Sequence, residues 1–231
     1  MTRVAILQSN YLPWKGYFDI IREVDLFVFY DDVQYTKNDW RNRNRIKTPQ
    51  GVQWLTIPVG ANLDRLICDV TFSESRWQQK HWKSLVQCYS AAPHWKWMGE
   101  FLHYIYLERK WKTLSELNQY AITTISRTFL GFTTEFRDSR DFPVKGQKQE
   151  RLLDLLSQVN ATDYLSGPAA RDYIDAAEFD ARGINLVYKS YQGYPEYPQL
   201  YPPFEHNVSV LDLLVMTGVD APRFVRGQPS W

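Results

Sequence analysis

The chain has 231 residues, a formal net charge of +1 and an aromatic content of 16%. A chain of this length suits one domain and buries roughly 70–75% of the surface of its unfolded form, so it can build a full core. The near-zero net charge argues against nucleic-acid and membrane-surface proteins, which usually carry a basic excess. The two cysteines, Cys68 and Cys88, provide neither a disulfide framework nor metal-ligand spacing. We therefore expect small-molecule partners, no nucleic acid, no membrane and no metal, while the cofactor and the oligomeric state stay unknown.

The chain runs from Met1 directly into a strand pattern and turns polar at Gln8. This opening stretch is too short for a signal peptide. No stretch reaches the roughly 20 apolar residues that span a bilayer. By elimination, the expected location is cytoplasmic.

The first third of the chain predicts a strand–loop–helix–strand unit followed by a hairpin. Apolar runs in it have the length and composition of buried strands, and Pro, Gln and Gly in succession mark the hairpin turn. The expected elements are a strand at Val4–Gln8, a helix at Tyr17–Arg22, a strand at Leu26–Tyr30, and hairpin strands at Arg45–Thr48 and Gln53–Ile57.

The middle of the chain is mainly helical in pattern. A strand near Ile67–Phe72 is followed by helices at Trp77–Tyr89, Trp95–Leu107 and Leu114–Phe129. Thr113 or Ser115 is the expected cap of the third helix. We expect this block, about residues 77–130, to form a helical subdomain that covers one side of the sheet within a single domain of residues 1–231.

Strands and helices alternate again toward the end of the chain. The expected elements are a strand at Thr134–Arg137, a helix at Gln149–Val159, a strand at Asp163–Ser166, a helix at Ala169–Ala181, a strand at Ile184–Tyr188 and a helix at Ser209–Met216. The Tyr- and Pro-rich segment Gln192–His206 predicts an ordered surface loop. This alternation indicates an α/β fold with a mainly parallel, Rossmann-like sheet and a helical insertion.

The loop that begins at Gln8 is the first candidate site. Ligands of open α/β sheets bind at the carboxyl ends of strands, and helix N-termini offer free N–H groups. Gln8 and Asn10 could hydrogen-bond a polar ligand, and Gly16 allows the backbone to approach it closely. Tyr11 and Trp14 have the amphipathic rings that suit pocket walls. The alternative is an ordinary tight turn whose amides cap the local backbone.

Two acids, Asp31 and Asp32, directly follow the second apolar strand. They could bind a cation, accept hydrogen bonds from an amine or a sugar hydroxyl, or act as a general base. Further on, Arg41, Arg43 and Arg45 alternate, which in an extended chain places them on one side, where they could grip a phosphate or carboxylate. The alternative is a solvated edge strand with internal Asp–Arg pairs.

Four more polar residues near these charges complete the expected binding set of this region. They are Gln34, Lys37, Asn38 and Asn42. Gln34, Asn38, Asn42 and the nearby Asn44 have side chains that both donate and accept hydrogen bonds, and their clustering with the charges favours a ligand-binding function over a solvated edge.

Two weaker candidates lie later in the chain. His81, next to Lys80 at the start of a helix, could carry a proton near neutral pH, although a lone helical histidine is more often structural. The turn at Ser166 and Gly167, followed by Arg171, is a second helix start that could attract an anion. Its alternative interpretation is a plain N-cap.

As a set, these segments resemble the WbqC-like protein family over nearly the whole chain. The motifs that carry the resemblance are 8–17, 31–35, 41–47, 55–59, 80–82, 164–167, 197–199 and 209–214. The family usually has Gln-Pro where this chain has Gln8-Ser9, which implies a less rigid first loop. The resemblance implies a bacterial protein associated with O-antigen and other surface-polysaccharide gene clusters. It implies no established reaction and no list of catalytic residues.

The first functional hypothesis is a small-molecule transferase of O-antigen biosynthesis. It would add an aminoacyl or acyl group to a nucleotide-linked amino sugar, with Asp31 or Asp32 as the base and His81 as a secondary proton carrier. Arg43 and Arg45 would hold phosphate or carboxylate.

Two alternatives belong to different classes. The layout also resembles Rossmann-like nucleotidylyltransferases, although Trp14 and Tyr17 stand where that group has histidines, so the likeness supports the fold more than the reaction. The other alternative is a non-catalytic scaffold or ligand-binding protein of the same pathway, with the loop Gln192–His206 as its contact surface.

Overall fold

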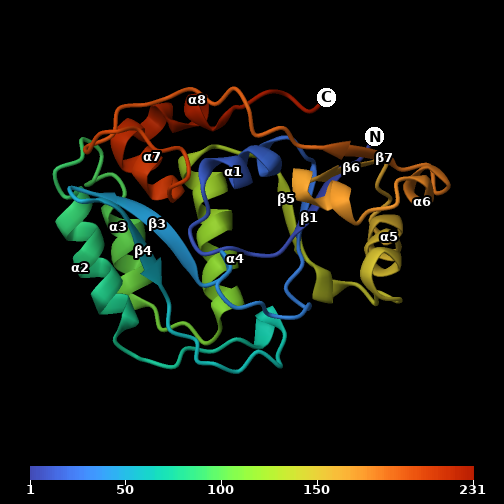
Figure 1. Cartoon of the computed structure of the whole chain (residues 1–231), viewed down its shortest axis with the longest axis horizontal. Coiled ribbons are helices and arrows are strands. Elements are labelled where there is room, and N and C mark those ends of the chain that lie inside the picture. The colour runs from blue at the N-terminus through green and yellow to red at the C-terminus, as the bar shows by residue number, and fades with distance from the viewer.

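The protein, described by a computed structural model of residues 1–231, is built around one five-stranded parallel sheet (Figure 1). Its strands are β1 (Arg3–Leu7), β2 (Leu26–Phe29), β5 (Glu135–Asp138), β6 (Asp163–Ser166) and β7 (Asn185–Tyr188). They lie in the order β5-β2-β1-β6-β7, and each neighbouring pair is parallel. The expected α/β fold with a mainly parallel, Rossmann-like sheet is confirmed.

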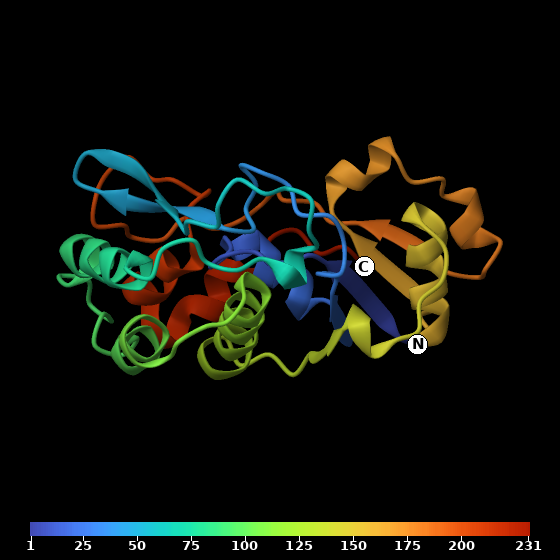
Figure 2. The ribbon, with the colours of Figure 1, turned by 90° about the horizontal axis from the view of Figure 1, so that it is seen from below.

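Helices cover both faces of the sheet (Figures 1 and 2). Helix α1 (Lys15–Arg22) joins β1 to β2 and belongs to the larger hydrophobic core. Helices α5 (Lys148–Gln158) and α6 (Ala177–Asp180) belong to a second, smaller core on the opposite face. The connection that follows β1 therefore covers one face of the sheet and leads to the strand on one side, β2. The connection that follows β6 covers the other face and leads to the strand on the other side, β7. The carboxyl ends of β1 and β6 form a topological switch point, the place where open α/β sheets bind ligands.

Between β2 and β5 the chain forms a hairpin and a block of helices. These elements are β3 (Arg43–Thr48), β4 (Gly51–Thr56), the 3₁₀ turn η1 (Ile67–Asp69), α2 (Trp77–Tyr89), α3 (Gly99–His103), the π-helical turn η2 (Tyr104–Glu108), α4 (Leu114–Thr124) and the π-helical turn η3 (Ile125–Phe129). They share the larger core with α1 and with the last helices, α7 (Val210–Thr217) and α8 (Ala221–Val225). The division into a domain with a helical subdomain stays a prediction.

Local chemistry explains where the helices begin. Thr113 caps α4, as expected, because its Oγ1 accepts a hydrogen bond from the Glu116 N–H at 3.2 Å. The single helix expected at Ala169–Ala181 is instead two pieces, the 3₁₀ turn η5 (Pro168–Asp172) and α6. A second helix starts because Asp175 Oδ1 accepts the Ala177 N–H at 3.0 Å, near the start of α6.

The strand expected near Ile67–Phe72 is wrong, since this segment begins with a 3₁₀ turn. Its backbone N–H groups form isolated hydrogen bonds instead of the ladder of a strand. The Ile67 N–H donates to Val33 O at 3.0 Å, and the Cys68 N–H donates to Asp31 O at 2.9 Å. The helix expected from Trp95 begins later, at Gly99, after a series of turns. Another 3₁₀ turn, η4 (Ser139–Asp141), follows β5, and η6 (Gly218–Asp220) follows α7.

The segment 192–206 has no helix or strand, as expected, and side chains from other elements hold it in place. Tyr197 Oη and Gln199 Nε2 donate to the buried carboxylate of Asp212, at 2.9 and 2.8 Å. The ammonium of Lys15 donates to Pro195 O at 2.9 Å and lies 5.1 Å from the Tyr197 ring centroid. These contacts fasten the loop to the start of α1 and to α7.

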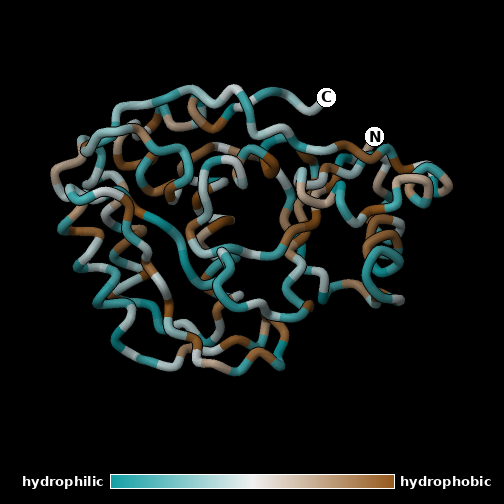
Figure 3. Tube along the Cα trace, in the orientation of Figure 1, coloured by the Kyte–Doolittle hydropathy of each residue, from teal (hydrophilic) through white to brown (hydrophobic).

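Apolar residues lie mainly along the central strands and the inner faces of helices, whereas the outer loops are mostly hydrophilic (Figure 3). The two termini lie near each other, with the Arg3 guanidinium 4.9 Å over the Trp231 ring. No helix combines the length and the apolar character that crossing a membrane requires.

Candidate functional site

An amide–arginine group forms where β1 ends. The guanidinium of Arg41 donates to Gln8 Oε1 at 3.0 Å and to Asn10 Oδ1. The Tyr11 N–H also donates to Trp40 O at 3.0 Å, so the two loops are tied by backbone as well. Three residues expected to bind ligand, from segments more than thirty positions apart, are thus brought together.

A cavity of about 400 Å³ lies beside this group. Its lining residues are Asn10, Pro13, Trp14, Trp40, Asn44, Arg45 and Asn207. No carboxylate lines it, and the amides can both donate and accept hydrogen bonds. Indole faces, amides and one guanidinium together suit a polar, ring-bearing anion.

Arg45 is the charged group of this cavity. Its guanidinium forms no ion pair and no hydrogen bond within the protein, and its Nε is buried without a partner. Because a buried N–H without a partner costs free energy, an unpaired guanidinium at a cavity wall is well placed to bind an anion.

The hairpin continues the cavity wall outward as an aromatic surface. The Trp40 and Trp54 rings lie 5.4 Å apart, and each side chain is about two-fifths exposed, at 41% and 42%. Arg43 lies 4.3 Å over the Trp54 ring, and Arg45 lies 5.8 Å from both rings. Arg43 and Arg45 thus share one side of β3, as their alternation predicted, whereas Arg41 precedes the strand and turns toward β1.

Trp14 forms another wall, and Gly16 makes its position possible. The Trp14 ring packs edge-on against Tyr191, with ring centroids 5.0 Å apart, and against Tyr194 at 5.7 Å. A Cβ added at Gly16 would lie 2.2 Å from the Trp14 ring. The glycine expected to serve the ligand therefore serves the packing of a cavity residue.

Asp31 is fully buried and holds three elements together. Its Oδ1 accepts the Ser9 N–H at 2.8 Å, and its Oδ2 accepts hydrogen bonds from Ser115 Oγ at 2.5 Å and Gln119 Nε2 at 3.0 Å. Both oxygens are used, and the side chain faces α4 rather than the cavity. Asp31 positions the ends of β1 and β2.

Asp32 faces the opposite side of the sheet, because consecutive residues of an extended chain point to opposite faces. It forms an ion pair with Arg151 of α5 and accepts a hydrogen bond from Ser139 Oγ at 2.6 Å. Its side chain is partly exposed at the carboxyl edge of the sheet, but it does not line the 400 Å³ cavity.

His81 and Tyr11 lie inside the core. His81 Nε2 donates to Thr56 O at 3.2 Å, so Nδ1 accepts from the Tyr11 hydroxyl at 2.9 Å. Burial lowers the pKa of His81 to about 4, which keeps the imidazole neutral near pH 7. Lys80, beside it in sequence, is instead exposed and forms an ion pair with Glu74 at 3.0 Å.

Two of the asparagines act on backbone. Asn42 Nδ2 donates to Ile57 O at 2.8 Å, and Asn44 Nδ2 donates to Leu12 O at 2.7 Å. Gln34 donates to Leu63 O, while Lys37 and Asn38 lie on the exposed loop before β3. Gln34, Lys37 and Asn38 are outside the cavity lining.

The end of β6 is a separate place from the cavity. Ser166 is buried, Gly167 rather than Ser166 precedes η5, and no side chain caps that turn. Arg171 lies 4.8 Å over the Tyr188 ring. The predicted anion site at this turn stays a prediction.

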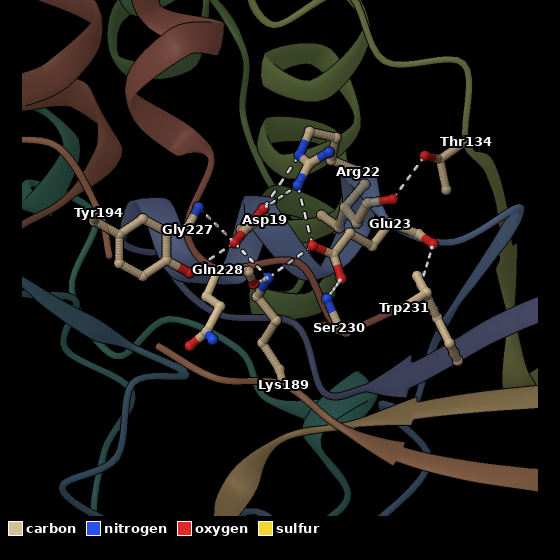
Figure 4. Close-up of polar contacts among 11 residues, drawn as sticks. Asp19, Arg22, Glu23, Thr134, Lys189, Tyr194, Gly227, Gln228, Ser230 and Trp231 are labelled. Carbon is tan, nitrogen blue, oxygen red and sulfur yellow. Dashed lines mark hydrogen bonds and ion pairs between the residues drawn. The ribbon is translucent and has the colours of Figure 1, made fainter. Parts of the chain in front are cut away.

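A buried ion cluster lies beside α1, and the sequence did not predict it (Figure 4). The Lys189 ammonium, fully buried just after β7, lies 2.7 Å from Asp19 Oδ2 and 2.8 Å from Glu23 Oε1. It also donates to Gln228 O at 3.0 Å, and Gly227 N donates to Asp19 Oδ2 at 3.1 Å. The cluster fastens the C-terminal segment to α1. A lysine directly after an apolar strand was the only signal available.

Asn207 and Trp40 are cavity residues that the sequence did not single out. Asn207 lies just before Ser209, whose Oγ accepts the Leu211 N–H at 3.3 Å as the cap of α7. Nothing in their local patterns separates them from other loop and core residues. No group of three or more His, Cys, Asp or Glu side chains is arranged to hold a metal ion.

The family model and the similar protein each match nearly the whole chain. The family model for the WbqC-like protein family matches residues 8–224. Rv1507c, an uncharacterised protein of Mycobacterium tuberculosis strain ATCC 25618 / H37Rv, is 46% identical over 228 residues, which covers 98% of each chain. No solved structure gives a significant match.

Proposed function

This chain belongs to the WbqC-like protein family, and we propose that it is a small-molecule transferase of bacterial O-antigen or other surface-polysaccharide biosynthesis. It adds an aminoacyl or acyl group to a nucleotide-linked amino sugar in the cytoplasm. The observation that carries the proposal is the cavity at the end of β1. It follows the carboxyl end of β1, the end of a strand at which open α/β sheets bind ligands, and its wall contains the unpaired guanidinium of Arg45.

The side chains around the cavity divide into ligand contacts and supports. Arg45 holds a phosphate or carboxylate of the ligand, and Asn10 and Asn207 orient its polar groups. Arg41 positions Asn10 by hydrogen bonding, so it acts through that residue rather than on the ligand.

Neither aspartate is assigned as the base. Both oxygens of Asp31 are used inside the fold, and Asp32 faces the other side of the sheet, where it pairs with Arg151 and Ser139. In the proposed transfer the neutral acceptor amine attacks the acyl carbon, the donor's leaving group departs, and the amine's proton passes to that leaving group or to solvent. We assign no proton transfer to His81, since it is enclosed in the core.

The test is a mass-spectrometric assay. The protein is incubated with UDP- and dTDP-linked amino sugars and either acetyl-CoA or aminoacyl-tRNA as donor. A product heavier by one acyl or aminoacyl group supports the proposal. Arg45→Gln should weaken nucleotide-sugar binding at least tenfold. Arg223→Gln, which changes an exposed side chain outside the cavity lining, is the control.

Absence of any acylated product with every donor and acceptor would refute the transferase proposal. Release of pyrophosphate from a nucleoside triphosphate and a sugar phosphate would instead assign nucleotidyl transfer.

A further inference from the structure

Four residues, Trp40, Arg43, Arg45 and Trp54, form an exposed surface, here called the Trp–Arg surface. Nothing in the fold requires this surface to be exposed. Arg45 and Trp54 are direct partners in the β3–β4 ladder, and Trp40 joins them from the preceding turn. Large aromatic side chains usually bury most of their area, and these two leave about two-fifths in solvent. Exposed aromatic groups gathered in one place mark contact sites.

The charge on this surface is not compensated by the protein. Neither Arg43 nor Arg45 forms an ion pair, and both have a buried Nε without a partner. Arg43 is fixed by a hydrogen bond to Asn38 O and by stacking 4.3 Å over Trp54. Indole faces next to fixed guanidinium groups are the surfaces on which nucleobases stack beside their phosphates.

The Trp–Arg surface is continuous with the cavity. Trp40 and Arg45 belong to both, so a ligand can extend from the hairpin into the cavity without leaving the protein. The inner end is lined by Trp14 and the amides of Asn10 and Asn207, which are neutral hydrogen-bonding groups that suit sugar hydroxyls. Arg45 lies between the two ends, where a diphosphate would lie.

We propose that the Trp–Arg surface is the subsite for the base of a nucleoside diphosphate. The base stacks on Trp40 and Trp54, the diphosphate binds Arg45, and the sugar enters the cavity. This inference rests on the proposed function and deepens it, because it assigns the nucleotide end of the substrate to two tryptophans. A neutral sugar on the tryptophans would leave the Arg45 guanidinium without an anion, which the diphosphate supplies.

The test is isothermal titration calorimetry with UDP, GDP, CDP and dTDP, and with glucose 1-phosphate as the ligand without a base. At least one nucleoside diphosphate should bind the wild-type protein more tightly than glucose 1-phosphate. For that nucleotide, Trp54→Leu and Trp40→Leu should each weaken binding by roughly 5- to 150-fold, the range of aromatic stacking on one base. Trp231→Leu, which removes a comparably exposed indole elsewhere, should leave binding unchanged.

Trp54→Phe separates stacking from folding, because it keeps an aromatic face and should recover part of the affinity that Trp54→Leu loses. Two results overturn the subsite: nucleotide binding that the Trp40 and Trp54 variants do not change, or glucose 1-phosphate binding as tightly as every nucleotide. If the tryptophan variants bind normally while Arg45→Gln still weakens nucleotide-sugar binding, this inference fails and the proposed function stands. If no nucleoside diphosphate binds the wild-type protein, the base subsite is wrong, and the acyl-transfer assay judges the proposed function separately.

Discussion

The hydroxyl of Tyr11 and Nδ1 of His81 lie 2.9 Å apart inside the core, although seventy residues separate them in the chain. The hydroxyl of Tyr106 contacts Tyr11 as well, and Trp77 packs edge-on against the His81 ring at 5.4 Å. A polar contact enclosed by aromatic rings orders the core, and it makes the stability of the fold depend on pH.

The first prediction concerns that pH dependence. Burial lowers the pKa of His81 from 6.5 to about 4, so below about pH 6.5 the unfolded chain binds a proton that the folded protein does not. This contribution to stability is therefore present at neutral pH and is lost as the pH falls toward 4. Between pH 7 and pH 5 it should lower the free energy of unfolding by about 2 kcal/mol.

Urea unfolding at the two pH values measures this loss, and His81→Gln should remove most of the difference. His103→Gln is the control, because that histidine is exposed beside Glu108. An equal pH dependence in the wild-type protein and in His81→Gln would contradict the assignment.

The second prediction concerns Gly16. In Gly16→Ala the new Cβ would meet the Trp14 ring at 2.2 Å, so the indole must move and the cavity wall must change. Overpacking of this kind costs about 1–3 kcal/mol of stability. Gly99→Ala is the matched control, because nothing lies within 4 Å of its added Cβ and alanine favours helix at the start of α3. Thermal unfolding of the two variants should show loss for the first and no loss for the second; the same melting shift in both would refute the packing argument.

The third prediction concerns Lys189. Lys189→Met leaves the two buried carboxylates of Asp19 and Glu23 with one cation, Arg22, in place of two, and the uncompensated charge should destabilise the protein by about 3–5 kcal/mol. Lys80→Met, which breaks the exposed pair with Glu74, should cost less than about 1 kcal/mol. Chemical denaturation compares the two, and equal costs would show that burial does not strengthen the Lys189 cluster.

The fourth prediction separates two serines beside Asp31. Ser9 Oγ is buried without a hydrogen-bond partner, so Ser9→Ala should be neutral or should stabilise the protein by up to about 1 kcal/mol. Ser115 Oγ donates to Asp31 at 2.5 Å, and Ser115→Ala should cost about 1–3 kcal/mol because the carboxylate loses a donor. Denaturant titration measures both changes; a destabilised Ser9→Ala would show that its hydroxyl has a partner in solution.

Much of the architecture was readable from local patterns. The apolar run Leu26–Tyr30 predicted a strand buried on both faces, and β2 occupies Leu26–Phe29. The strand at Asp163–Ser166 and the helix at Trp77–Tyr89 lie where the sequence predicts them. Such patterns are local because side-chain periodicity and capping depend on residues a few positions apart.

The candidate site was only half readable. Polar residues after the first strand indicated Asn10, and the alternation of arginines indicated Arg45; both line the cavity. Asp31, chosen because it follows the second strand, and His81, chosen as a group that titrates near neutral pH, have side chains that the fold encloses. These patterns passed over Trp40, since an exposed tryptophan and a core tryptophan look alike in a sequence.

The sequence by itself determined the alternation of strands and helices that builds the parallel sheet and the polar character of the loops that follow its strands. The tertiary structure alone decided which of those polar groups face a cavity, which form hydrogen bonds with the backbone and which are paired in the core. The physical reason is that burial, pKa and pairing depend on neighbours that are distant in the chain, such as Arg151 for Asp32 and Ser115 for Asp31.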